Sequence, residues 1–293
     1  MRYKTLFFLL TFVWTALSVT GKQRDFVLQS GIPVPIACNS SEEQVVHTAL
    51  ELLRRDLQTV LSATAKVETN TGTILIGTAG RSELIDQSGV DTSVLKGKKQ
   101  AFLLTVSPEG KLIVAGSDGH GTAYGILEIS RLLGVSPWEW WADVTPEKKK
   151  LFKLSSKFRS VQSPSVEYRG IFINDEDWGL MPWSNKTYEP SDVNGEIGPR
   201  TNERIFELLL RLRANTYWPA MHECTLPFFL TKGNREVAKK YGIFMGASHC
   251  EPMACSAAGE WRRRGNGAYD YVNNSAAVYK FWEDRVKEVA DQE

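Results

Sequence analysis

Short apolar runs in the second half of the chain each end in a polar cluster. These runs, rich in β-branched and aromatic side chains, cover residues 169–173, 214–220 and 243–248. Amphipathic helical patterns follow them at residues 201–213, 234–241 and 275–290. A strand followed by a helix, repeated along the chain, predicts a parallel sheet, because the helix must carry the chain back before the next parallel strand can start.

The first half of the chain predicts a small α/β unit of its own. Residues 40–64 have apolar positions at helical spacing, with Ser40 and Glu43 placed as a capping box. A second helix is expected over residues 122–133, ended by Gly134 in the left-handed conformation. Strand patterns lie at residues 73–77, 102–106 and 111–115, and a Pro- and Gly-containing turn joins the last two.

The Lys- and Ser-rich stretch 145–165 is interpreted as a connector, with a domain boundary near Ser163. We therefore expect an α/β fold in which residues 22–163 form a small N-terminal α/β domain and residues 164–293 form the first part of a (β/α)8 TIM-type barrel. A complete barrel needs roughly 250 residues, so the barrel is expected to be truncated. Because the loops after the strands of such a barrel converge on one open face, the polar clusters predict an active site and an enzyme.

Residues 1–21 have the pattern of a secretory signal peptide: a basic start, an apolar stretch and small residues up to Gly21. We expect a secreted or periplasmic protein with no membrane association beyond this peptide. The 35 Lys and Arg residues nearly balance the 34 Asp and Glu residues, so a nucleic-acid partner is not expected. Four cysteines are too few for a scaffold held by disulfides.

The polar groups after the first two runs suit sugar recognition. Asn174 and Asp175 offer donors and acceptors to sugar hydroxyls, with a loop or helix cap as the alternative. Trp218 could present its ring face to the C–H surface of a sugar, although aromatic residues on strands usually belong to the core. Since Tyr217 and Trp218 alternate along a strand, only one of them can point into a pocket.

Two histidine–acid pairs follow the later runs, His222 with Glu223 and His249 with Glu251. A polar pair directly after an apolar strand is costly to bury unless each group finds a partner. Neighbouring barrel loops share one mouth, so both pairs are assigned to the binding site. The alternative is a core histidine bonded to the backbone.

A zinc site is a competing interpretation, with candidate ligands His222, Cys224, His249, Cys250 and Cys255. Their spacing matches no common zinc module, and the adjacent His249 and Cys250 would point to opposite sides of an extended strand. We therefore expect no metal and no other cofactor.

Several longer motifs carry a resemblance to a known family. They are residues 116–125 (GSDGHGTAYG), 134–143 (GVSPWEWWAD), 168–180 (YRGIFINDEDWGL), 214–223 (ANTYWPAMHE) and 248–253 (SHCEPM). From about Phe26 onward the chain resembles glycoside hydrolase family 115, the xylan α-1,2-glucuronidases. The resemblance implies an inverting glycosidase that removes α-1,2-linked (4-O-methyl)glucuronic acid from glucuronoxylan.

In the resembled family the acid and base candidates lie on later barrel strands, so the catalytic residues are unknown for this chain. The resemblance therefore implies a substrate-holding role for Asn174, Asp175, Trp218, His222, Glu223, His249 and Glu251. The chain by itself is expected to be an inactive fragment, and a homodimer of the full-length form stays open. A non-catalytic carbohydrate-binding fragment is the alternative function, followed by a zinc-dependent hydrolase.

A uronic acid also needs a partner for its carboxylate, usually an Arg or a Lys. Arg169 and the run 262–264 are available in the sequence, although most of the run is expected to lie in a solvated Gly-rich loop. The Gly-rich residues 116–125 lack both the dinucleotide fingerprint and the Lys-Ser/Thr pair of a phosphate-binding loop.

Overall fold

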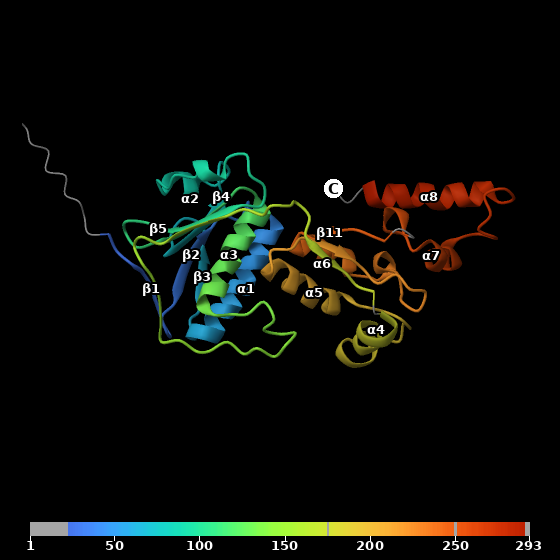
Figure 1. Cartoon of the computed structure of the whole chain (residues 1–293), viewed down its shortest axis with the longest axis horizontal. Helices are drawn as coiled ribbons and strands as arrows, with labels where there is room; N and C mark the ends of the chain where they lie inside the picture. Colours follow the sequence, from blue (N-terminus) through green and yellow to red (C-terminus); the bar gives the residue numbers. More distant parts are fainter. Residues whose placement is uncertain (1–22, 175, 249–250, 291–293) are drawn as a thin grey trace, which may run out of the picture.

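The computed structural model describes residues 23–174, 176–248 and 251–290, which form a mixed α/β fold (Figure 1). Its N-terminal part is built on a six-stranded sheet in the order β3-β2-β4-β6-β5-β8. These strands are β2 (Val34–Cys38), β3 (Ala65–Glu68), β4 (Ile74–Thr78), β5 (Phe102–Val106), β6 (Leu112–Gly116) and β8 (Arg159–Gln162). The neighbours among β3, β2, β4 and β6 are parallel, whereas β5 is antiparallel to β6 and β8. The predicted strands β4, β5 and β6 are confirmed to within one residue at each end.

Two long helices, α1 (Gln44–Leu61) and α3 (Gly119–Leu133), lie side by side against this sheet (Figure 1). The side chain of Asp118 caps α3 by accepting a hydrogen bond from the backbone N–H of Gly121 at 2.8 Å. Gly134 ends the helix with a φ of 96°, as its position predicted. The Gly121 N–H in the Gly-rich first turn of α3 is therefore satisfied within the protein.

The predicted capping box of α1 is wrong. The helix begins at Gln44, and Glu43 precedes it without a side-chain cap bond. The Glu43 carboxylate instead pairs with Arg81 at 2.6 Å. Ser40 lies outside the helix because the next residue, Ser41, is held in a turn by its hydrogen bonds to the Asn39 side chain.

The stretch expected to be a connector contains two strands, which corrects that interpretation. β7 (Leu151–Leu154) pairs antiparallel with β1 (Phe26–Gln29), and β8 extends the six-stranded sheet. Phe152 and Leu154 are buried, and the Phe152 ring meets Phe26 edge-on at 6.3 Å. The surrounding lysines obscured the alternating pattern of β7, which is short. Its partner, β1, lies more than a hundred residues away in the sequence.

The C-terminal part is built on a three-stranded parallel sheet in the order β11-β10-β9. Its strands are β9 (Gly170–Phe172), β10 (Thr216–Trp218) and β11 (Phe244–Met245). The main helices of this part are α5 (Pro199–Arg211), α6 (Asn234–Tyr241) and α8 (Ser275–Ala290). The parallel pairing and all three helices were predicted, but the strands are shorter than the apolar runs, which continue into the loops after them.

The remaining elements are short. They are α2 (Glu83–Gln87), η1 (Ser93–Leu95), η2 (Glu176–Leu180), α4 (Met181–Trp183), η3 (Ser184–Tyr188), η4 (Phe228–Leu230), η5 (Pro252–Ala254) and α7 (Ala257–Arg264). The segments η2, α4 and η3 follow one another without a break, so residues 176–188 make one irregular helical stretch between β9 and α5.

One apolar core joins the two parts. Buried residues of the first sheet, α1 and α3 belong to the same cluster as those of α5, β10 and α6. A buried ion pair crosses this junction, since the Arg211 guanidinium bonds Asp56 through two nitrogens at 2.8 and 3.0 Å. Figure 1 shows α1 and α3 in the middle of the molecule, between the first sheet and α5 and α6. Across the described part of the chain, no helix combines the length and the apolar character that a membrane span needs.

Candidate functional site

The ends of β9, β10 and β11 lie at one edge of the parallel sheet, because the three strands run in the same direction. Asn174 follows β9 and is exposed, Trp218 is the last residue of β10, and Glu251 follows β11 and is buried. The parallel sheet therefore brings these three predicted site residues to one edge. Asp175 and His249, which were also assigned to the site, lie outside the described residues.

Tyr217 and Trp218 point to opposite faces of the sheet, as their alternation predicted. Tyr217 is buried, with its ring edge-on to Phe206 of α5 at 5.3 Å. Trp218 is 40% exposed and meets Phe172 at 5.7 Å. Its indole also covers Gly246, since a Cβ built there would lie 2.0 Å from the indole nitrogen. Trp218 is thus the member of the pair that faces the outside at the strand ends.

Asp177 links the loop after β9 to the loop after β10. One carboxylate oxygen of Asp177 lies 3.1 Å from His222 Nδ1, and the other accepts a hydrogen bond from the Cys224 thiol. The hydrogen bonds from Cys224 and then His222 lower the pKa of the Asp177 carboxyl, so it is ionised at neutral pH. From the sequence, Asp177 was one of several acids after the first apolar run that could hold substrate, and Cys224 was only a candidate zinc ligand; neither was predicted to bond the other or His222.

The predicted pair of His222 and Glu223 does not act as a pair. His222 turns to Asp177, whereas the exposed Glu223 carboxylate forms an ion pair with Arg262. Arg262 lies on α7, which corrects the interpretation of the arginine run as a solvated loop. The third arginine of the run, Arg264, is half-buried and bonds Glu288 of α8 at 2.7 Å. Two of the three arginines therefore form ion pairs with residues outside α7.

Arg169, the other candidate for uronate capture, does not face the strand ends. It precedes β9, and its guanidinium donates to the backbone oxygens of Arg213, Val166 and Glu167 at 2.7 to 2.9 Å. The same group also donates to the Gln100 side chain at 2.7 Å. With its donors used in this way, Arg169 connects the N-terminal part to the start of the parallel sheet.

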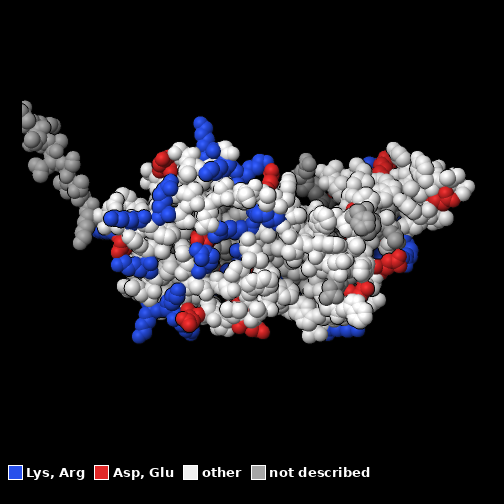
Figure 2. All heavy atoms as spheres, viewed as in Figure 1, with Lys and Arg blue, Asp and Glu red and all other residues white. Residues whose placement is uncertain are grey.

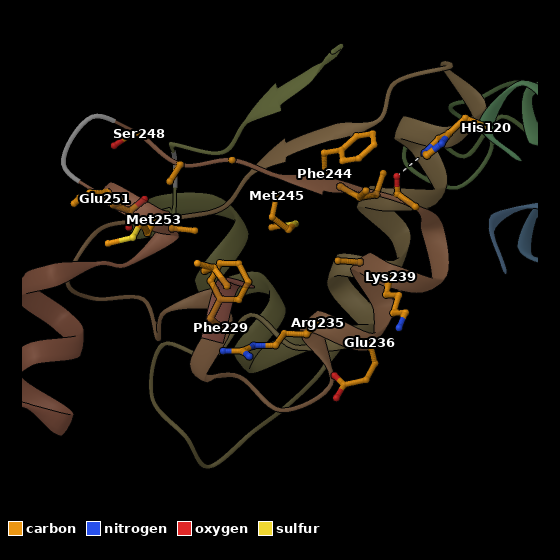
Figure 3. Close-up of a pocket in the computed structure, with 18 residues that line it drawn as sticks. His120, Phe229, Arg235, Glu236, Lys239, Phe244, Met245, Ser248, Glu251 and Met253 are labelled. Carbon is orange, nitrogen blue, oxygen red and sulfur yellow. Dashed lines mark hydrogen bonds between the residues drawn. The ribbon is translucent and has the colours of Figure 1, made fainter. Parts of the chain in front are cut away.

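A cavity of about 980 Å³ lies along β11 on the side of α6 (Figure 3). In the close-up, the charged ends of Arg235, Glu236 and Lys239 extend from α6, and Glu251 and Met253 lie across the hollow from them. Of the described residues that were assigned to the site, only Glu251 lines this cavity. Trp218, Asp177 and His222 do not line the cavity, although Gly246, which does, lies against the Trp218 indole.

No set of three or more His, Cys, Asp or Glu side chains within the described ranges is arranged to hold a metal ion. Cys224 bonds Asp177, while Cys255 is fully buried, and burial raises the pKa of its thiol to about 11. His249 and Cys250, two of the proposed zinc ligands, lie outside the described residues.

Charged side chains are unevenly distributed over the face of the molecule shown in Figure 2. Lys and Arg gather over the N-terminal part, while the C-terminal part is largely uncharged in this view. On this face there is no broad basic surface over the C-terminal part.

Comparisons with known proteins agree on one family. The model of glycosyl hydrolase family 115 matches residues 161–293. A solved family 115 4-O-methyl-α-glucuronidase, with specificity for decorated arabinogalactans, is 83% identical at a TM-score of 0.89, over 92% of this chain and 35% of its own length. The search of curated proteins gave no match.

More distant structures are much less similar. CpGH84D is 12% identical at a TM-score of 0.51, over 77% of this chain and 35% of its own. A family 20 exo-β-N-acetylglucosaminidase from Vibrio harveyi is 13% identical at a TM-score of 0.46, over 84% of this chain and 37% of its own. The chain thus spans about a third of the structures that it matches, and on its match to the family model and its 83% identical relative it belongs to glycoside hydrolase family 115.

Proposed function

We propose that this chain contributes residues that bind the sugar in the active site of an α-glucuronidase. The enzyme acts on (4-O-methyl)glucuronic acid side chains of a polysaccharide. The observation that carries the proposal is the 83% identity to a 4-O-methyl-α-glucuronidase over 92% of the chain. We also propose that β9, β10 and β11, with the helices between them, are the first units of a (β/α)8 barrel. The parallel order of the strands and the polar groups at one edge support this architecture.

The polysaccharide is proposed to be a decorated arabinogalactan rather than glucuronoxylan. The family resemblance alone favours xylan, but the 83% identical relative has specificity for decorated arabinogalactans. A difference this small in sequence leaves most positions that contact the polymer unchanged. Affinity electrophoresis of the chain in gels that contain either polymer tests this choice. Stronger retardation of the chain by glucuronoxylan than by decorated arabinogalactan would favour glucuronoxylan as the substrate.

Within the site, Trp218 supplies a ring face against the C–H surface of the sugar, and Asn174 supplies an amide to its hydroxyls. The carboxylates after β9 and β10 have partners already: Asp177 bonds His222, and Glu223 pairs with Arg262. A general acid and a general base must be able to exchange protons with the substrate. We therefore assign the described residues to holding the sugar, and not to proton transfer.

Binding of free glucuronic acid, followed by ligand-observed NMR titration, tests the proposal directly. Trp218→Ala is expected to weaken binding by about fivefold or more, because the loss of one ring contact amounts to roughly 1 kcal/mol. Tyr279→Ala is the control, since Tyr279 is 65% exposed on α8 and has no role in the site. Equal affinities in wild type and Trp218→Ala would remove Trp218 from the site, and no binding by the wild type would contradict the proposed function.

We further propose that residues 1–21 direct export, which gives a secreted or periplasmic enzyme. The basic start and the apolar stretch of this segment support the proposal. N-terminal sequencing of exported protein is expected to begin near Lys22. A mature protein that still starts at Met1 would argue against it.

A further inference from the structure

A group of partly exposed aromatic rings lies at the end of the helical stretch of residues 176–188 and has no role in the function described so far. Trp140 and Trp141 come from the turn after α3, and Trp183 and Tyr188 come from α4 and η3. Ring centres of Trp140 and Trp141 are 4.8 Å apart, Trp140 and Tyr188 are 5.1 Å apart, and Trp183 stacks on Tyr188 at 4.9 Å with a 6° interplanar angle. We call these four residues the aromatic cluster. None of its rings is fully buried, so the cluster forms surface as well as packing.

Two arginines of α5 lie over these rings. The guanidinium carbon of Arg204 is 5.0 Å from the ring centre of Trp140, and that of Arg200 is 5.1 Å from the ring centre of Tyr188. Arg204 also donates to Glu207 at 3.1 Å and to the Tyr188 hydroxyl at 3.3 Å. These contacts fix Arg204 and its two rings in place.

Arg200 differs from Arg204 because it is exposed and its guanidinium has no ion pair among the described residues. A guanidinium over a ring face keeps nitrogen donors along its edge, and two of them can hold a carboxylate together. Trp183 and Arg200 already cover the ring of Tyr188, so the partly exposed indoles of the aromatic cluster are the rings that can offer apolar surface to the C–H groups of sugars. This combination fits a glycan that carries uronic acids, with Arg200 on a carboxylate and the rings on neighbouring sugars.

The aromatic cluster is connected to the strand ends by the helical stretch of residues 176–188. Asp177 lies at the start of this stretch, and the next residue, Trp178, is 88% exposed. Tyr188 closes the stretch. A polymer whose uronic acid enters the strand-end site would continue along this stretch toward the aromatic rings at its end.

We propose that Arg200 and the aromatic cluster form a second binding surface for the same acidic polysaccharide, outside the site that holds the released sugar. This inference rests on the proposed function for its substrate class. Neutral sugars of the main chain lie on the rings, and Arg200 selects stretches of polymer that carry another uronic acid nearby. The surface raises affinity for the polymer without changing affinity for free glucuronic acid.

Affinity electrophoresis of the 293-residue chain tests the proposal, with glucuronic-acid-decorated arabinogalactan and the same polymer after carboxyl reduction as the two probes. Arg200→Gln is expected to weaken binding to the decorated polymer by roughly tenfold, the effect of losing a hydrogen-bonded charge contact. Arg263→Gln is the matched control, because Arg263 is an exposed arginine on α7. Trp183→Ala is expected to weaken binding to both polymers, and circular dichroism checks that this variant stays folded.

The outcomes separate this proposal from the proposed function. If Arg200→Gln and Arg263→Gln bind the decorated polymer equally, the second surface is overturned while Trp218→Ala still reports on the strand-end site. If Arg200→Gln loses as much affinity for free glucuronic acid as for the polymer, Arg200 belongs to the first site and the proposal is also overturned. Preferential loss of polymer binding, with free glucuronic acid binding unchanged, supports it.

Discussion

The buried pair of Asp56 and Arg211 allows a quantitative test of how the two parts of the molecule depend on each other. Asp56 lies on α1 and Arg211 on α5, and both side chains are only 4% exposed. Two nitrogens of Arg211 bond the two carboxylate oxygens, and its third bonds Glu207 at 3.0 Å. Asp56→Asn keeps the shape of the side chain but removes its charge, and it leaves a buried guanidinium with one fewer ionic partner.

The expected cost follows from this geometry. Removing one partner of a buried ion pair destabilises a protein by about 3 to 5 kcal/mol. Because Glu207 continues to bond Arg211, the lower end applies, and we expect a loss of about 3 kcal/mol. In urea unfolding, this corresponds to a drop of roughly 1 M or more in the midpoint. Far-UV circular dichroism and tryptophan fluorescence should report the same midpoint, because one core joins the two parts.

Glu51→Gln is the control, since Glu51 pairs with Arg54 on the exposed side of the same helix. Exposed pairs contribute about 0 to 1 kcal/mol, so this variant should unfold close to wild type. A midpoint for Asp56→Asn no lower than that of Glu51→Gln would refute the reasoning. Separate transitions for the two probes in the wild type would show that the parts unfold independently.

Three further predictions concern the site and the stability of the fold. Gly246→Ala is expected to lower glucuronic acid affinity as Trp218→Ala does, because the new Cβ would lie 2.0 Å from the indole nitrogen, whereas Gly259→Ala on α7 should leave the affinity unchanged in the same NMR titration. Gly134→Ala is expected to lower the free energy of unfolding in urea by about 1 kcal/mol, because the residue has a φ of 96°; an unchanged midpoint would contradict this. Burial acts to raise the pKa of Glu207, but hydrogen bonds and charges of arginines on α1 and α5 outweigh it and lower the pKa from 4.5. Ionised Glu207 therefore stabilises the fold above about pH 4.5, and this stabilisation is lost as the pH falls below that value. Between neutral pH and about pH 3, the free energy of unfolding should fall less in Glu207→Gln than in wild type.

Much of the local structure could be predicted because its signals lie within a few residues of each other. Helix α6 begins and ends at the predicted residues, since its apolar spacing and the glycine after it, Gly242, act locally. The arginine run was assigned to a loop because its flanking glycines are poor helix formers. In the structure Trp261 is buried against Phe281 of α8, and that tertiary contact outweighs the weak propensity of α7.

The candidate site was only partly accessible from the sequence. The alternation of Tyr217 and Trp218 was enough to predict that one of them faces outward. The bond between Asp177 and His222 joins residues 45 positions apart, so no local pattern could specify it. Arg169 had the right charge for a uronate, but its place before β9 directs it to the backbone and to Gln100.

The sequence by itself determined the helices, the alternation of faces on each strand and the motifs that carry the family, because these depend on neighbouring residues. Tertiary structure alone decided which polar groups meet. Parallel pairing of β9, β10 and β11 brings separate loops to one edge, and the packing of α5 against α1 turns Asp56 and Arg211 into a buried pair. The physical reason is that a charged side chain takes whichever partner the packed chain places within reach, and sequence distance does not limit that choice.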